Sequence, residues 1–102
     1  MIKLIEEHLS EIAQVCRKHS VKRLELFGSA ASGSFDGSTS DLDFLVEFLS
    51  YDTPAIADQW FGLQEDLAKL LGHRVDLTSL RMARNPYFLE VANRQRVNLY
   101  AA

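Results

Sequence analysis

The sequence has few of the features that mark secreted or membrane proteins. It contains one cysteine, Cys16, so no internal disulfide can form, and we expect a reducing, cytoplasmic setting in which Cys16 packs as a small apolar residue. No apolar run approaches the length of a membrane-spanning helix. The first twenty residues carry six charged side chains where a signal peptide needs an apolar segment, so we expect neither export nor membrane insertion.

Positive charge is also in deficit. Eleven lysines and arginines stand against fourteen aspartates and glutamates, and the formal net charge of −3 opposes attraction to a phosphate backbone, so direct nucleic-acid binding is not expected. The 102 residues, 47% of them hydrophobic, are enough for one core and too few for two, so we expect residues 1–102 to form a single domain. A bulky substrate must then arrive as another chain, and whether the chain forms a homo-oligomer stays open.

Two segments have the periodicity of amphipathic helices. Apolar residues at steps of three and four predict a first helix that ends before Val21, with an apolar stripe made of Ile2, Ile5, Leu9, Ile12 and Cys16. A second helix is predicted to begin around Asp52-Thr53-Pro54 and to stop at Gly72. A short third helix is predicted to open at Asn85-Pro86.

Between these helices the pattern changes to alternation. It predicts strands over residues 21–27, 41–48, 74–78 and 97–100. Glycines and hydroxyl residues crowd residues 28–40, which are expected to form a loop. The order of elements predicts an α/β (α+β) fold, a small mixed β-sheet with helices packed on one face and the opposite face open.

Three aspartates are expected to share the open face of this sheet. Asp41 and Asp43 are two residues apart, so their side chains point the same way with Cα atoms about 6–7 Å apart, and Asp76 joins them if its strand is a neighbour. Two such charges repel by about 2–3 kcal/mol at an effective dielectric of about 20, a penalty that a divalent cation reverses. Oxygen ligands favour Mg²⁺ or Mn²⁺, and a third carboxylate allows a second metal that activates a hydroxyl. A pair of this kind is also common at solvated strand ends.

A glycine–serine turn directly follows the first predicted strand. Gly28 and Ser29, with Gly33 four residues after Ser29, would let backbone N–H groups and the Ser29 hydroxyl approach a phosphate. Ser40, directly before the paired aspartates, either contacts the substrate or orients the turn into the strand. Each signal alone is common, but a strand, a Gly-Ser turn and then Ser-Asp-x-Asp opening the next strand form a much more specific combination.

This combination resembles the signature of the polymerase-beta-like nucleotidyltransferase superfamily, and the short chain resembles its minimal nucleotidyltransferase (MNT) branch. The matching segments are Leu26-Phe27-Gly28-Ser29 with Gly33, then Ser40-Asp41-Leu42-Asp43-Phe44-Leu45-Val46, and Val75-Asp76-Leu77. The resemblance implies that Asp41 and Asp43 bind the metal ions that carry a nucleoside triphosphate. It also implies that Asp76 serves the acceptor-side metal and that the Gly28-Ser29 turn holds the phosphates.

The resemblance further implies metal-dependent transfer of a nucleoside monophosphate, AMP from ATP, to a hydroxyl of a macromolecular acceptor. Proteins of this branch are commonly antitoxins paired with a helical HEPN-type ribonuclease toxin, and some transfer AMP to a tyrosine of that toxin. The alternative is a catalytically weak or inactive protein-binding module that neutralises its partner by occlusion.

One departure from the family pattern concerns the turn. Ala30, Ala31 and Ser32 stand where proteins of this branch often carry basic residues. Two interpretations stay open: either the affinity for the triphosphate is weak, or a partner or a distant arginine such as Arg74, Arg81, Arg84 or Arg96 supplies the positive charge.

Overall fold

The structure, a computed structural model, describes residues 3–28, 41–80 and 96–102. Its elements in chain order are α1 (Lys3–Glu7), α2 (Leu9–Lys18), β1 (Val21–Phe27), β2 (Leu42–Phe48), α4 (Ile56–Leu71), β3 (Val75–Ser79) and β4 (Val97–Ala101). The expected loop after Gly28 and the short helix at Asn85-Pro86 lie outside the described residues. Within the described residues, no helix has both the length and the apolar character needed to cross a bilayer.

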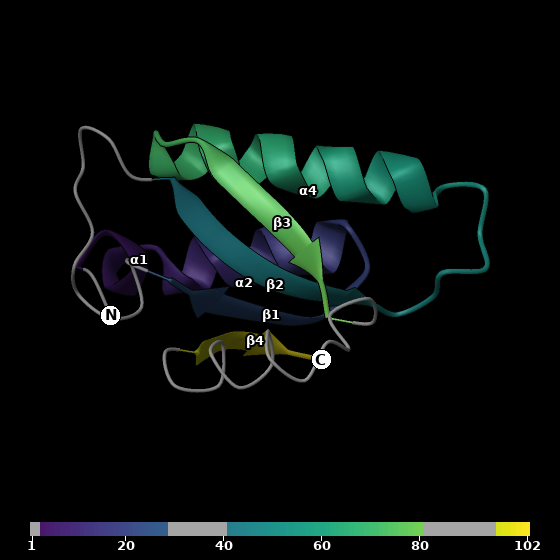
Figure 1. Cartoon of the computed structure of the whole chain (residues 1–102), viewed down its shortest axis with the longest axis horizontal. Coiled ribbons are helices and arrows are strands. Elements are labelled where there is room, and N and C mark those ends of the chain that lie inside the picture. Colours follow the sequence, from purple (N-terminus) through teal and green to yellow (C-terminus); the bar gives the residue numbers. More distant parts are fainter. Residues whose placement is uncertain (1–2, 29–40, 81–95) are drawn as a thin grey trace.

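The four strands form one mixed sheet in the order β3-β2-β1-β4 (Figure 1). β1 runs antiparallel to both β2 and β4, whereas β2 and β3 are parallel. Parallel neighbours need a crossover, which α4 provides. The mixed sheet with helices confirms the α+β fold predicted from the sequence.

Helices α2 and α4 pack on the same face of the sheet (Figure 1). The even-numbered residues of β2 belong to the core cluster together with residues of both helices, as alternation requires when one face is buried. The buried apolar residues of this cluster are Ile5, Ile12, Cys16, Val21, Leu24, Leu26, Leu42, Phe44, Val46, Phe48, Leu63, Leu67, Leu71 and Val75. Burial raises the pKa of the Cys16 thiol to about 12, which agrees with its predicted role as a small apolar residue.

The second long helix ends where the sequence predicts. Gly72 has a φ of 68° in the left-handed region, and its N–H donates to the carbonyl of Ala68 at 2.8 Å. The helix begins at Ile56, a few residues after the predicted start signature, because Thr53 first forms a turn in which its carbonyl accepts from the Ile56 N–H at 3.2 Å. This helix returns the chain so that β3 can run alongside β2.

The N-terminal segment differs from the single helix that was predicted. It divides at His8, whose N–H donates to the carbonyl of Ile5 at 3.1 Å and whose Nδ1 lies 2.8 Å from the carbonyl oxygen of Leu4. Ile5 of α1 and Ile12 of α2 are buried, whereas Leu9, directly after the break, is 37% exposed. The predicted burial of Leu9 is therefore wrong.

The sheet face opposite the helices is less open than predicted. Glu25 of β1 and Leu45 of β2 are partners across the strands and point away from the core cluster, yet they are 5% and 0% exposed. Oε2 of Glu25 lies 2.6 Å from Nε of Arg96, an ion contact without the alignment of a hydrogen bond. A buried carboxylate needs such a partner, because an unpaired buried charge is strongly unfavourable.

Candidate functional site

The parallel register of β2 and β3 brings two of the predicted site residues side by side. Asp43 and Asp76 are direct Cα partners, and adjacent strands lie about 4.8 Å apart. Asp41 directly precedes β2, where the N–H of Leu42 donates to the carbonyl of Arg74 at 2.9 Å. By alternation from buried Leu42, all three carboxylates belong to the sheet face opposite α2 and α4, which we call the carboxylate face.

The pKa of Asp43 is shifted by this arrangement. Burial raises its pKa above the ordinary value of 3.8, and the nearby charges of Asp76 and Asp41 raise it further. Asp76 is exposed, so the group of carboxylates is open to solvent on its β3 side. Like charges held together in this way are typical of sites that a cation completes.

These residues have the donor atoms that Mg²⁺ or Mn²⁺ prefers. Asp41, Asp43 and Asp76 offer only carboxylate oxygens, and Mg²⁺ usually takes one or two of these and completes its shell with water and substrate phosphates. In the described ranges, no three or more His, Cys, Asp or Glu side chains converge closely enough to hold an ion by themselves. The carboxylate oxygens themselves are donors of the kind that a divalent cation shared with a substrate would use.

The end of β1 lies directly against this group. Phe27 is the strand partner of Asp43, and Gly28, the next residue, has a φ of 77°. A Cβ atom at Gly28 would lie 2.9 Å from Oδ2 of Asp43, so only glycine leaves the carboxylate its present position. The structure thus brings Gly28, Asp41, Asp43 and Asp76 together. The other predicted phosphate-binding residues, Ser29, Gly33 and Ser40, lie outside the described residues.

The structure describes two of the candidate arginines, Arg74 and Arg96, which differ in partner and in exposure. Nε of Arg74 lies 3.9 Å from Oδ1 of Asp41, and the Arg74 side chain is 79% exposed. Arg96 is paired with Glu25 at 2.6 Å, with side chains only 29% and 6% exposed. Arg81 and Arg84 lie outside the described residues. Sequence reasoning did not identify the neighbour of each arginine, although Arg74 precedes Asp76 by two positions and so shares its strand face.

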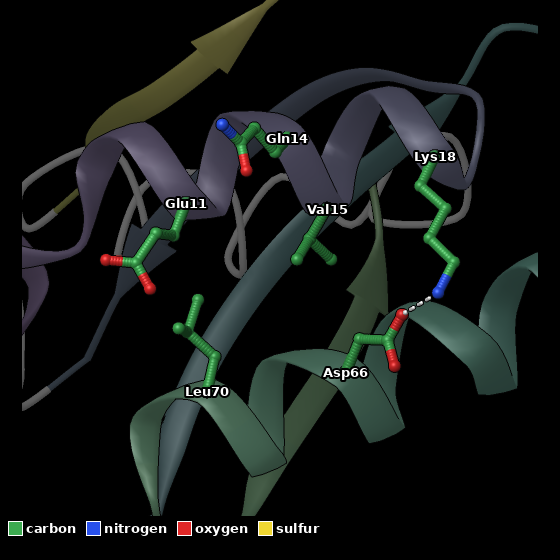
Figure 2. A pocket seen from close by; sticks show the side chains of 6 residues that line it. All are labelled: Glu11, Gln14, Val15, Lys18, Asp66 and Leu70. Atoms are coloured by element: carbon green, nitrogen blue, oxygen red, sulfur yellow. Dashed lines mark hydrogen bonds and ion pairs between the residues drawn. The ribbon is translucent and has the colours of Figure 1, made fainter.

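A separate hollow of about 360 Å³ lies between α2 and α4, on the other side of the sheet (Figure 2). Its lining residues are Glu11, Gln14, Val15, Lys18, Asp66 and Leu70. Oδ2 of Asp66 accepts from Lys18 at 3.2 Å and lies 2.6 Å from Nε2 of His19. The His19 ring lies over Gly62, where a Cβ atom would come within 2.7 Å of it. These contacts join the two helices and are distant from the carboxylate face.

Comparison with known proteins identifies the family. The family model described as a nucleotidyltransferase domain matches residues 9–98. The chain belongs to this nucleotidyltransferase family. A relative from Methanocaldococcus jannaschii, provisionally named a protein adenylyltransferase, is 39% identical over 87 residues, which cover 78% of this chain and 85% of the relative.

Solved structures place this nucleotidyltransferase in the minimal branch. One provisionally described as a minimal nucleotidyltransferase has a TM-score of 0.74 and 31% identity, and the match covers 94% of this chain and 95% of that one. The fold is also shared with a complex of a tri-AMPylated HEPN toxin of Shewanella oneidensis and its MNT antitoxin. That match has a TM-score of 0.64 at 21% identity and covers 95% of this chain and 72% of that chain.

Proposed function

We propose that this minimal nucleotidyltransferase transfers AMP from ATP to a hydroxyl of a separately encoded protein, and that this protein is a HEPN-type toxin. The observation that carries the proposal is the register that sets Asp43 beside Asp76, with Gly28 against Asp43. The adenylyl donor and the protein acceptor are supported by the name of the M. jannaschii relative and by the AMPylated toxin in the complex that shares the fold. The whole chain acts as one domain in this proposal.

In this proposal Asp41 and Asp43 hold Mg²⁺ or Mn²⁺ together with the triphosphate. The residue types support it, because three carboxylates held on one face repel one another until a cation binds. The cation supplies charge neutralisation of the phosphates and polarisation of the α-phosphorus. Gly28, Ser29 and Gly33 contribute backbone N–H groups and a hydroxyl to the β- and γ-phosphates, and Ser40 orients the paired aspartates.

Asp76 is assigned to the acceptor. Its exposed carboxylate lies beside Asp43, where a hydroxyl of an approaching protein can reach it. The acceptor oxygen forms a new bond to the α-phosphorus while the bond to the bridging oxygen of the β-phosphate breaks, and pyrophosphate leaves. The hydroxyl proton passes to the carboxylate of Asp76 and then to solvent. The products are the adenylylated protein, pyrophosphate and one proton.

Two substitutions separate donor binding from transfer. Asp76→Asn should abolish transfer and leave the stabilisation by Mg·ATP largely intact, because Asp76 serves the acceptor side. Ser29→Ala should weaken nucleotide binding by about 1 kcal/mol, the usual contribution of one hydrogen bond. Thermal melts with and without Mg·ATP measure binding, and mass spectrometry of the co-purified partner measures AMP transfer.

The same experiment tests the alternative of an inactive binding module. If the parent chain gains no thermal stability from Mg·ATP, and Asp41→Asn neutralises the co-expressed partner as well as the parent does, neutralisation occurs by occlusion. The basic-poor turn from Ala30 to Ser32 is the sequence feature that favours this alternative. A partner that gains the mass of AMP with the parent and not with Asp76→Asn excludes it.

A further inference from the structure

The lysines and arginines that the structure describes differ in whether their side chains could reach a triphosphate at the carboxylate face. Several lysines form ion pairs with acidic residues on the helices: Lys3 with Glu7, Lys18 with Asp66 and Lys69 with Glu65. Lys22 and Arg23 lie at the start of β1, whereas Gly28 follows its end. Arg74 is the described cation that forms an ion pair with one of the three site carboxylates.

Arg96 is not available to bind the triphosphate, because it is paired with the buried Glu25. Its pair with Glu25, at 2.6 Å, is closer than the pair of Arg74 with Asp41 at 3.9 Å, and the Glu25 side chain is 6% exposed. Moving Arg96 to a phosphate would leave a buried carboxylate without a counter-ion, which is strongly unfavourable. Arg96 is therefore a structural residue that joins the start of β4 to β1.

Arg74, in contrast to Arg96, has an exposed side chain and a long ion contact. Its backbone is fixed, because its carbonyl accepts the Leu42 N–H at 2.9 Å, while its side chain is 79% exposed. The contact with Asp41, at 3.9 Å, is long, and exposed pairs of this kind constrain a side chain weakly. The guanidinium can thus leave Asp41 without loss of a buried contact.

We propose that Arg74 is a phosphate-binding residue whose guanidinium exchanges Asp41 for phosphate oxygens of the nucleotide when a divalent cation occupies that carboxylate. The proposal rests on the proposed function, because it assigns Asp41 to the metal-bound triphosphate. A planar guanidinium fits two phosphate oxygens at once, which an ammonium does not. Arg74 would then supply the positive charge that the turn after Gly28 lacks.

This exchange predicts two effects of opposite sign. Without nucleotide, Arg74 competes with the cation for Asp41, so its removal should strengthen binding of the metal alone. With nucleotide, Arg74 contacts the phosphates, so its removal should weaken binding of the metal–nucleotide complex. A residue with a purely structural role would change both affinities in the same direction.

The test uses the full chain and two probes, Mn²⁺ alone and Mn²⁺ with α,β-methylene ATP, in which a methylene group prevents transfer. In Arg74→Gln, Mn²⁺ alone should bind about 3-fold more tightly, as expected when one nearby exposed positive charge is lost. The analogue with Mn²⁺ should bind about 10-fold more weakly, as expected for one lost charge-assisted contact. Free Mn²⁺ is measured by its paramagnetic resonance signal and the analogue by calorimetry.

Two control variants accompany this one. Arg17→Gln removes the same charge from the exposed side of α2, and both affinities should stay within about 2-fold of the parent because salt screens distant charges. Arg74→Lys keeps the charge without the planar fork, so its affinity for the analogue should lie between those of the parent and Arg74→Gln.

Each outcome decides the proposal. Unchanged affinities in Arg74→Gln, or losses of both together with a lower melting temperature, overturn the role of Arg74 and leave the proposed function standing. An Arg74→Lys chain that binds the analogue as the parent does overturns the guanidinium contact, because charge alone then suffices. A parent chain that does not bind the analogue with Mn²⁺ removes the proposed function itself.

Discussion

A Cβ atom added to Gly28 would lie 2.9 Å from Oδ2 of Asp43, closer than real Cβ atoms approach other atoms. The two residues come from neighbouring strands, since Asp43 is the Cα partner of Phe27. Gly28, which the sequence predicts to contact phosphate, therefore also leaves the space that the carboxylate of Asp43 occupies. A side chain at residue 28 would require the carboxylate of Asp43 to shift.

Gly28→Ala should lower the free energy of unfolding by about 1–2 kcal/mol, because a side chain disfavours the left-handed backbone, and it should also displace Asp43. Gly72→Ala is the matched control. Gly72 has a similar φ of 68°, but a Cβ atom there meets nothing within 4 Å. Both variants should melt at lower temperature, and only Gly28→Ala should lose Mg·ATP binding. Equal nucleotide binding in the two variants would contradict the contact.

Asp43→Asn should melt at the same temperature as the parent or slightly higher, in chelator at neutral pH. The raised pKa of Asp43 means that its charged form is disfavoured in the folded chain. At a pH below 3.8, the ordinary pKa, Asp43 is protonated and its raised pKa favours the folded state fully. The advantage is lost as the pH rises through the raised pKa that Asp43 has in the folded chain. The difference between the two proteins should vanish in acid. A clearly less stable Asp43→Asn chain at neutral pH would instead give Asp43 a structural role.

Asp66→Ala should lower the free energy of unfolding by about 1 kcal/mol at pH 7, through loss of the hydrogen bond that joins α2 and α4. That bond to His19 is the main reason why the pKa of Asp66 lies below its ordinary value of 3.8. The stabilisation by Asp66 is present at a pH above 3.8 and is lost as the pH falls through the lowered pKa that Asp66 has in the folded chain. The difference in stability between the parent and Asp66→Ala should therefore disappear in acid.

The neighbouring residue supplies the control for this prediction. Glu65→Ala breaks an exposed pair with Lys69 at 2.9 Å, and solvent-exposed pairs of this kind contribute little to stability. Denaturant unfolding at several pH values compares the two variants. An effect of Glu65→Ala as large and as pH-dependent as that of Asp66→Ala would show that the His19 contact contributes nothing specific.

Arg96→Met should lower the free energy of unfolding by about 3 kcal/mol, because it leaves the carboxylate of Glu25 buried and unpaired. The double variant Glu25→Leu with Arg96→Met should recover most of this loss, since apolar replacement of a buried pair is often neutral. Urea unfolding of the three proteins measures both effects. A double variant as unstable as the single one would mean that Arg96 stabilises the chain through other contacts.

Alternation made the strands predictable. A strand with one buried face must repeat every two residues, so β1 is found at the predicted residues, β2 and β4 differ by one residue at one end, and β3 is shifted by one residue. The same rule placed Asp43 and Asp76 on one face, subject to the strands being neighbours, and the parallel pairing of β2 with β3 confirms that condition.

Other features depend on contacts that no local pattern contains. Glu25 has the alternation of an exposed residue, yet it is buried and its carboxylate pairs with Arg96, which is distant in the sequence. The break at His8 interrupts a continuous apolar periodicity, because the local bond to Leu4 competes with the helix. The pairing of Arg74 with Asp41 and of Arg96 with Glu25 depends on positions in space that the local sequence does not contain.

The place of β3 in the sheet adds a consequence for Asp76. In the part of the chain that is described, β3 is an outer strand, and outer strands present unpaired backbone groups on which a strand of another molecule can assemble. Asp76 is the one charged residue of Val75–Ser79, and a charge on an outer strand hinders such assembly. Loss of this carboxylate is therefore expected to favour strand-to-strand aggregation, separately from the acceptor-side role proposed for Asp76.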